Sequence, residues 1–190
     1  MSRLLLIRHG APQAAWGGAG DDPGLSDLGH AQALEAAHAL RAYGGIEVIS
    51  SPMRRCLETA APFGAWRGRA PRIEARVSEI VADEGVDDRA AWLQARFPWR
   101  DRANPRLWPS LEPRLHVWRA DVLEAVSTIQ EDAAVFTHFI SINVIVGAAM
   151  GRGETIVCIP GHASITELEV REGRLTLVRL GAEMAVDDVR

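Results

Sequence analysis

Short apolar runs alternate with longer segments of helical periodicity along the chain. The apolar runs predict strands, because short stretches of hydrophobic residues bounded by turn residues are typical of buried strands. They lie at 3–7, 47–49, 72–75 and 133–137, followed by a closing pair at 165–170 and 175–180. Strands this uniformly apolar are typical of a mostly parallel sheet with helices on both faces.

Helical periodicity fills the intervals between these runs. Ser26 is placed to cap one helix, and Ser51 followed by Pro52 has the cap-then-proline pattern of a second one. The expected helices cover about 27–43, 52–62, 110–131 and 138–151. The alternation of strand and helix predicts an α/β fold, a three-layer α/β/α sandwich, in a single domain that spans 1–190.

The segment 81–109 breaks this alternation. It has a short helical pattern near 88–97 and is rich in tryptophan and arginine: Trp92, Trp99, Trp108, Arg89, Arg96, Arg100, Arg102 and Arg106. We interpret it as an insertion near the active-site crevice, and its indole rings as a small satellite core rather than a ligand-binding box. Arg102 or Arg106 could still face a substrate.

The charge balance and the absence of lysine restrict the possible functions. The 21 basic and 25 acidic residues give a net charge of -4, so no bulk positive field attracts nucleic acid or an anionic membrane. Every basic residue is arginine, which excludes Schiff-base chemistry and the phosphate-loop lysine of nucleotide hydrolases. The first apolar run is too short for a secretory signal and no run is long enough for a membrane span, so we expect a cytoplasmic protein. Cys56 and Cys158 lack zinc-site spacing, and neither a metal nor a cofactor is expected.

Polar side chains follow the expected parallel strands at the points where these strands end. Arg8 and His9 follow the first strand, the segment 50–55 the second, Glu79 the third and His138 the fourth. Because open parallel sheets bind ligands outside the carboxyl ends of their strands, we expect these residues to share one crevice.

Such a set of residues suits phosphoryl transfer without a metal ion. Guanidinium groups bind phosphate oxygens in a bidentate manner, and a second, protonated imidazole can supply further positive charge. A neutral imidazole can attack phosphorus, and a carboxylic acid can protonate the leaving oxygen. Gly10 would let the backbone pass close to the phosphate.

The motifs around these residues resemble those of the histidine phosphatase superfamily, also called the phosphoglycerate mutase-like family. The resemblance covers nearly the whole chain and is carried by the segments 6–10, 24–33, 50–60 and 135–138. It implies that His9 is the phosphorylated nucleophile and that Glu79 is the proton donor. It also implies that Arg8, Arg55 and His138 form the phosphate pocket.

Some positions leave alternatives open. The segment after Glu79 lacks the family's usual Gly-x-Trp-Glu-Gly continuation, so Asp83 or Glu84 could replace Glu79 as the proton donor. His162 lies where the family's chain returns near the crevice, and it is either a substrate contact or an ordinary loop histidine. The other candidates are expected to be structural or solvated: His30, His38, His116 and Arg54.

These residues predict a histidine acid phosphatase-type phosphomonoesterase that hydrolyses a small phosphorylated metabolite. A phosphoglycerate mutase-type phosphotransferase would use the same residues, and a non-catalytic module that binds a phosphate ligand is the alternative outside enzymes. The sequence does not identify the physiological substrate or the oligomeric state, although a sheet edge or exposed tryptophans could form a homodimer.

Overall fold

A six-stranded sheet forms the centre of the computed structural model, which describes residues 1–13 and 22–189. The strands are β1 (Ser2–Arg8), β2 (Glu47–Ser50), β3 (Arg72–Ile73), β4 (Ala133–Thr137), β5 (Ile165–Arg171) and β6 (Arg174–Arg179). Their order is β3-β2-β4-β1-β5-β6, with parallel pairing from β3 to β1 and antiparallel pairing of β5 with both β1 and β6. The expected mostly parallel sheet is therefore confirmed.

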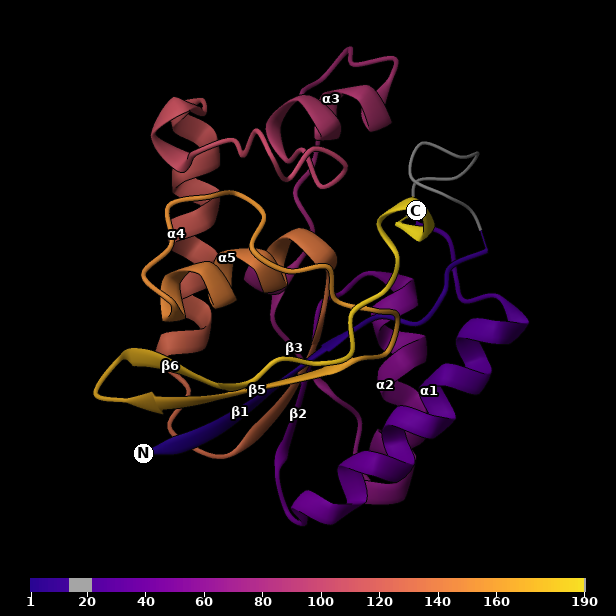
Figure 1. Ribbon diagram of the computed structural model, residues 1–190. Helices are drawn as coiled ribbons and strands as arrows, with labels where there is room; N and C mark the ends of the chain where they lie inside the picture. Colours follow the sequence, from indigo (N-terminus) through magenta and orange to yellow (C-terminus); the bar gives the residue numbers. More distant parts are fainter. Residues whose placement is uncertain (14–21, 190) are drawn as a thin grey trace.

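Helices cover both faces of this sheet, with α1 and α2 on one face and α4 and α5 on the other (Figure 1). The helices are α1 (Asp27–Leu40), α2 (Arg54–Arg67), α3 (Arg89–Arg96), α4 (Pro113–Ser127) and α5 (Phe139–Ala149), with 3-10 turns η1 (Arg41–Tyr43), η2 (Ala75–Val77), η3 (Trp108–Ser110) and η4 (Val186–Asp188). Successive side chains of a strand point to opposite faces, so Leu5 and Ile7 pack with α1 and α2, whereas Leu4 and Leu6 join the cluster around α4 and α5. The three-layer α/β/α fold follows. No helix within 1–13 and 22–189 has the length and apolar character needed to span a bilayer.

The boundaries of α2 differ from those expected. The helix begins after Met53, which is the cap residue in place of Ser51. The Ser51 hydroxyl contacts the Ser78 and His138 side chains and accepts from the Met53 N–H. The helix also continues past Pro62 until Gly68, whose φ of 69° forms a left-handed cap. A proline removes one backbone hydrogen bond, and here burial of neighbours such as Phe63 against the sheet keeps the helix intact. Helix α4 is likewise shorter at both ends than its periodicity predicted.

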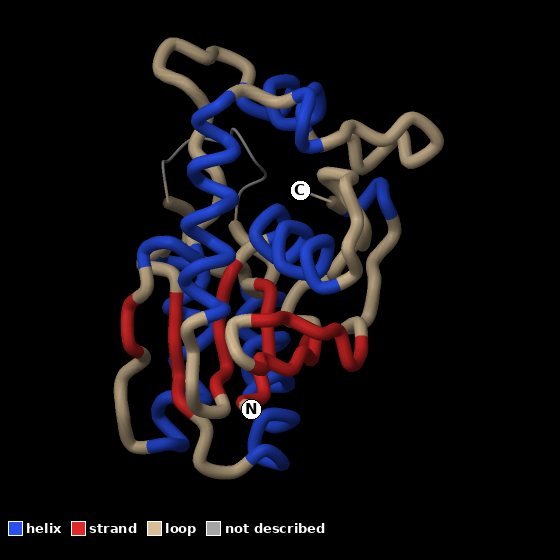
Figure 2. Tube along the Cα trace, turned by 90° about the vertical axis from the view of Figure 1, so that its left-hand side faces the viewer, coloured by secondary structure: helices blue, strands red, loops and turns tan. Residues whose placement is uncertain are grey.

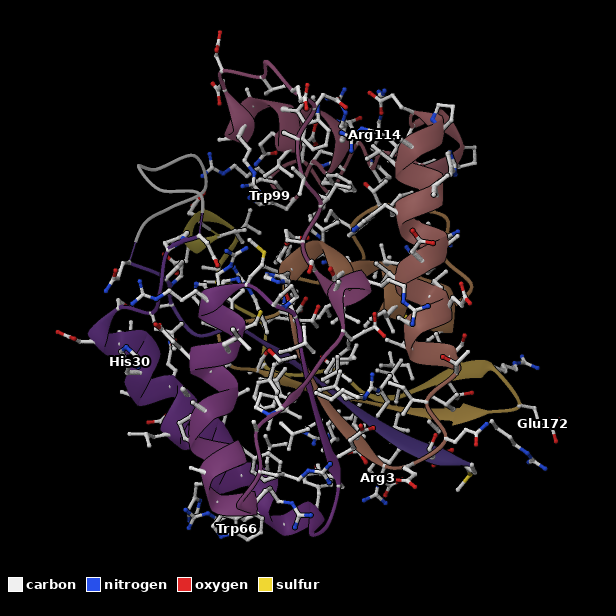
Figure 3. All side chains as sticks on the ribbon, turned by 180° about the vertical axis from the view of Figure 1, so that it is seen from behind. Arg3, His30, Trp66, Trp99, Arg114 and Glu172 are labelled. Atoms are coloured by element: carbon white, nitrogen blue, oxygen red, sulfur yellow. The ribbon has the colours of Figure 1, made fainter. Side chains whose placement is uncertain are left out.

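The segment 81–109 lies beyond the carboxyl ends of the parallel strands, where α3 and its flanking loops gather (Figure 2). Its three tryptophans, Trp92, Trp99 and Trp108, are buried in the same cluster as the apolar face of the sheet. The expected satellite core is therefore wrong. The rings extend the main core because Trp99, labelled in Figure 3, packs with its centroid 6.0 Å from the Phe139 ring of α5.

The last residues of the chain return to the same end of the sheet. After β6, the Met184 N–H donates to Ile159 O, and the Gly161 N–H donates to Ala182 O. The C-terminus therefore lies on the side of α3, opposite the N-terminus of β1 (Figure 1). The loop 159–164 is also held against the end of β1, because the Ala163 N–H donates to Arg8 O and the Arg8 N–H donates to Ser164 O.

Candidate active site

The carboxyl ends of the parallel strands bring four of the expected residues together. Arg8 ends β1 and His9 follows it, His138 follows β4 and precedes α5, and Arg55 lies in the first turn of α2. The His9 and His138 ring centroids are 5.3 Å apart, and Arg55 Nη2 lies 3.2 Å from His138 Nδ1. All four side chains are buried. The structure thus places two imidazoles and two guanidinium groups in one buried site.

His9 is held with one ring nitrogen available. Its Nδ1 lies 2.8 Å from Gly10 O, and because a carbonyl can only accept, Nδ1 carries the ring proton. Its Nε2 is buried and has no hydrogen-bond partner among the described residues. Burial, reinforced by the charge of Arg8, lowers the pKa of His9 well below its usual value. The imidazole is therefore neutral, with the Nε2 lone pair free to attack an electrophile.

His138 has the opposite arrangement of its ring proton. Arg55 can only donate, so Nδ1 of His138 accepts its hydrogen bond and Nε2 donates to Ser51 Oγ at 2.9 Å. Burial, followed by the charges of Arg55 and Arg8, lowers the pKa of His138 well below its usual value. The protonated form expected from the sequence therefore requires an anion in the site, whose charge would raise this pKa.

The two arginines keep donor groups for an anion. Arg8 Nη1 donates to Pro160 O at 2.9 Å and to Met184 Sδ at 3.0 Å, whereas its buried Nε and Nη2 have no partner among the described residues. Burial lowers the pKa of Arg8 to about 9, so it is still charged at neutral pH. Arg55 pairs with Asp22 at 3.5 Å and also has a buried Nε without a partner in the described part of the chain. Such N–H groups match the oxygens of a phosphate.

Glu79 lies in the loop that follows β3 and η2, and its carboxyl group is buried. Its Oε1 accepts from the Ile80 N–H at 3.2 Å, and its Oε2 accepts from the Ile140 N–H in the first turn of α5 at 3.1 Å. Burial raises the pKa of Glu79 in spite of these donors and the charge of Arg55. A carboxyl group with a raised pKa retains its proton to higher pH, as a general acid requires.

The two alternative proton donors have different environments. Asp83 accepts from Arg114 Nε and from Trp92 Nε1, and the hydrogen bond from Arg114 lowers the pKa of Asp83. An ionised, ion-paired carboxylate is a poor proton donor. Glu84 is exposed to solvent. Of the three candidates, Glu79 has the environment that suits proton donation.

His162 lies beside the nucleophile candidate. Its ring centroid is 5.7 Å from that of His9, and its Nδ1 lies 3.3 Å from His9 O. The side chain is half-buried, so it lies at the edge of the crevice and not in its interior. The structure places the other basic candidates elsewhere: His30 and His38 exposed on α1, His116 beside Trp108 on α4, and Arg54 exposed and paired with Glu58.

The two cysteines are buried thiols. Cys56 Sγ lies 3.3 Å from His138 Nε2, and burial raises the pKa of Cys56. Burial also raises the pKa of Cys158, to about 12. Across 1–13 and 22–189, no group of three or more histidine, cysteine, aspartate or glutamate side chains is arranged to hold a metal ion.

Residues 4–183 match the family model of the histidine phosphatase superfamily, branch 1. The chain belongs to the histidine phosphatase superfamily. A glucosyl-3-phosphoglycerate phosphatase of Mycolicibacterium vanbaalenii is 34% identical over 109 residues, which cover 53% of this chain and 48% of the relative. The match therefore spans about half the length of that relative.

Solved structures extend the likeness over almost the whole chain. The structure of a mycobacterial glucosyl-3-phosphoglycerate phosphatase in complex with VO3 has a TM-score of 0.71 and 26% identity, and the alignment covers 96% of this chain and all of that one (100%). The Bacillus stearothermophilus protein YhfR has a TM-score of 0.75 at 18% identity, with 98% and 99% of the two chains covered. This second likeness shows the fold alone.

Several residues that organise this histidine phosphatase site were not identified from the sequence. The Gly10 N–H donates to Thr59 Oγ1 at 2.9 Å, and Asp22 and Met184 contact the two pocket arginines. Thr59 belongs to a recognised motif, whereas no sequence signal links Asp22 or Met184 to the pocket. The structure adds a reason for glycine at position 10, because a Cβ there would lie 2.6 Å from Gly29 O of α1.

Proposed function

We propose that this chain is a phosphomonoesterase that hydrolyses a small phosphorylated metabolite through a phosphohistidine on His9 Nε2, without a metal ion. The observation that carries the proposal is the tautomer of His9, since Gly10 O binds the proton on Nδ1 and leaves Nε2 unprotonated in a buried site. The flanking arginines and membership of the superfamily support the same activity.

In the first step, the Nε2 lone pair of His9 attacks phosphorus while the bond from phosphorus to the leaving oxygen breaks. The N–H groups of Arg8, Arg55 and His138 stabilise the charge on the non-bridging oxygens. Glu79 gives its proton to the leaving oxygen, so the product departs as a neutral alcohol. The raised pKa of Glu79 supports this role.

In the second step, a water molecule attacks the phosphohistidine. Its proton passes to the carboxylate of Glu79, the bond between nitrogen and phosphorus breaks, and the electron pair returns to His9 Nε2. Inorganic phosphate leaves and both residues regain their starting protonation states. We assign His162 a contact with the substrate, because its ring borders that of His9.

Glucosyl-3-phosphoglycerate is the first metabolite to assay, because two of the relatives carry it in their names. Other phosphorylated sugars and phosphorylated hydroxy acids complete the screen. All are small phosphomonoesters.

Hydrolysis of p-nitrophenyl phosphate in the presence of a chelator tests the proposal. We expect turnover by the wild type and none by His9→Ala, together with an acid-labile phosphoenzyme that forms only with His9 present. The matched control is His38→Ala, which removes an exposed histidine from α1 and should keep full activity.

Each other outcome would count against a particular part of the proposal. Activity that disappears in chelator and returns with a divalent ion would exclude the metal-free mechanism. If His9→Ala turned over the substrate at the wild-type rate, His9 would not be the nucleophile. A wild type that binds phosphate without turnover would favour the binding module or a mutase.

A further inference from the structure

The Ser51 hydroxyl binds the ring nitrogen of His138 that does not contact Arg55. His138 Nε2 lies 2.9 Å from Ser51 Oγ, whereas His138 Nδ1 lies 3.2 Å from Arg55 Nη2. Both Ser51 and His138 are buried. The Ser51 N–H donates to Phe136 O of β4 at 3.0 Å, which fixes the serine to the strand that His138 follows. The hydroxyl is therefore held in one place beside the imidazole.

The other contacts of the Ser51 hydroxyl make it a hydrogen-bond acceptor toward His138. Its oxygen accepts from the Met53 N–H at 3.3 Å. Its proton is directed at Ser78 Oγ, which lies 3.2 Å away. A hydroxyl has two lone pairs and one proton, so these two contacts leave a single lone pair for His138 Nε2.

The two neighbours of the His138 ring select the same tautomer. Arg55 can only donate at Nδ1 and Ser51 accepts at Nε2, so the neutral ring carries its proton on Nε2. A second acceptor near Nε2, the Cys56 sulfur at 3.3 Å, is a weak one. When a phosphate binds beside Arg55, a proton taken up at Nδ1 lets the ring donate to it, and Nε2 still donates to the serine. The Ser51 hydroxyl thus fits the neutral ring and the protonated ring.

We propose that Ser51 is a positioning residue, which holds the His138 imidazole with Nδ1 directed to Arg55 and to the phosphate of the substrate. This inference rests on the proposed function and adds a residue that acts through another side chain. Without the hydroxyl, the buried Nε2–H has no oxygen acceptor, and the ring is free to rotate or to carry its proton on Nδ1. The donor to the transferring phosphoryl group is then misaligned.

Two variants of nearly equal shape provide the kinetic test. Threonine and valine both add one methyl group at position 51, and only threonine keeps a hydroxyl. Ser51→Val should have a kcat for p-nitrophenyl phosphate about 10- to 100-fold below that of Ser51→Thr, because it leaves a buried donor to a charged site unsatisfied. The change in KM should be smaller, since His138 is proposed to act on the phosphoryl group in the transition state. Ser51→Ala should lose activity to the same extent as Ser51→Val.

Nitrogen NMR of protein with isotope-labelled histidine reports the state of the ring directly. The chemical shifts distinguish a protonated ring nitrogen from an unprotonated one, and the signals missing in His138→Asn assign those of His138. The wild type at neutral pH should carry its proton on Nε2, and saturating inorganic phosphate should add a second proton on Nδ1. Ser51→Thr should match the wild type, whereas Ser51→Val should place the neutral proton on Nδ1 in part or all of the molecules. A role of Ser51 in folding alone would not change the tautomer.

Ser50→Ala is the matched control. Ser50 is also buried, and its hydroxyl donates to Ser51 O at 2.8 Å instead of contacting His138. This variant should keep the kcat and the His138 tautomer of the wild type. Thermal melting of each variant reports whether the fold is retained, and the wild-type spectrum tests the proposal even where a variant does not fold.

The inference is overturned if His138 Nε2 is unprotonated in the wild type, or if Ser51→Thr and Ser51→Val have the same kcat or the same tautomer. A loss of kcat in Ser50→Ala as large as that in Ser51→Val would also overturn it, because any buried hydroxyl would then have the same effect. The NMR results do not depend on turnover. The proposed hydrolysis fails separately, if the wild type does not turn over p-nitrophenyl phosphate through His9.

Discussion

The carboxyl edge of the sheet and the segment 81–109 hold their charged side chains in different ways. At the sheet edge, backbone groups hold the groups proposed to react: a carbonyl binds His9 Nδ1, and two backbone N–H groups bind the carboxyl group of Glu79. In the segment, side chains hold side chains, as where Arg96 pairs with Glu112 and lies 4.3 Å from the Trp92 ring centroid.

This difference has consequences for how the site works. Backbone groups of a packed sheet have little freedom, so they can hold reacting atoms in one geometry. Long side chains on a helix and its loops adjust more easily, and such regions commonly carry specificity. The comparison therefore places the proposed reacting groups at the sheet edge and none of them in the segment 81–109.

The largest expected effect is at the proposed proton donor, Glu79. Glu79→Gln should reduce kcat by about 10³-fold with an alkyl phosphate, because a poor leaving group needs the proton. With p-nitrophenyl phosphate, whose leaving group needs no proton, the loss should be less than about tenfold. Steady-state kinetics on both substrates measures the difference.

Asp83→Asn is the control for this prediction. Asp83 belongs to the segment and is paired with Arg114, so both rates should stay near those of the wild type. If Asp83→Asn shows the leaving-group dependence and Glu79→Gln does not, the proton donor lies in the segment 81–109. The proposal that all reacting groups lie at the sheet edge is then wrong.

The next effect concerns the phosphate pocket. Arg55→Lys should reduce kcat/KM for p-nitrophenyl phosphate by about 10²-fold, because an ammonium group cannot reproduce the guanidinium fork between His138 and a phosphate. Its neighbour Arg54 is exposed and paired with Glu58, so Arg54→Lys should be nearly silent. The reverse order of the two losses would show that the wrong arginine has been placed in the pocket.

The sheet edge could be predicted from the sequence because two independent signals agree there. Apolar strands followed by polar residues locate the crevice, and the motifs around Arg8, His9 and His138 resemble those of a known family. The segment 81–109 has no such signal. Burial of Trp99 depends on its contact with Phe139 of α5, a residue distant in sequence.

Element boundaries were predicted less well than the elements themselves, for the same reason. Pro62 is a local signal for the end of a helix, yet α2 continues to Arg67 because its apolar face packs on the sheet. Met184 contacts Arg8 from the other end of the chain, and no local sequence pattern predicts this contact.

Burial of the two histidines at the sheet edge should make stability depend on pH. Burial, followed by arginine charges, lowers the pKa of both His9 and His138, whereas the unfolded chain titrates near 6.5. As the pH falls below about 6.5, only the unfolded chain takes up these protons. The free energy of unfolding should then fall by up to about 1.4 kcal/mol per pH unit for each histidine.

The raised pKa of Glu79 acts in the opposite direction, since its contribution to stability is lost as the pH rises through the folded value. Comparing variants therefore isolates the histidines. Denaturant unfolding between pH 7 and pH 5 should show a shallower fall for His138→Asn than for the wild type, and no change of slope for His38→Asn, which alters an exposed residue. Equal slopes in all three proteins would mean that His138 is protonated in the folded state.

The smallest effect is expected where the segment meets α4. Arg114, labelled in Figure 3, pairs with Asp83 and donates to Val81 O at 3.1 Å, and both charged side chains are about half exposed. Exposed ion pairs contribute little, so Arg114→Gln should lower the free energy of unfolding by less than about 1 kcal/mol. It should also leave kcat/KM for p-nitrophenyl phosphate unchanged, because the sheet edge holds the reacting groups without it. A tenfold loss of activity in Arg114→Gln would show that the segment 81–109 helps to position the reacting groups, and the separation between the two regions would then fail.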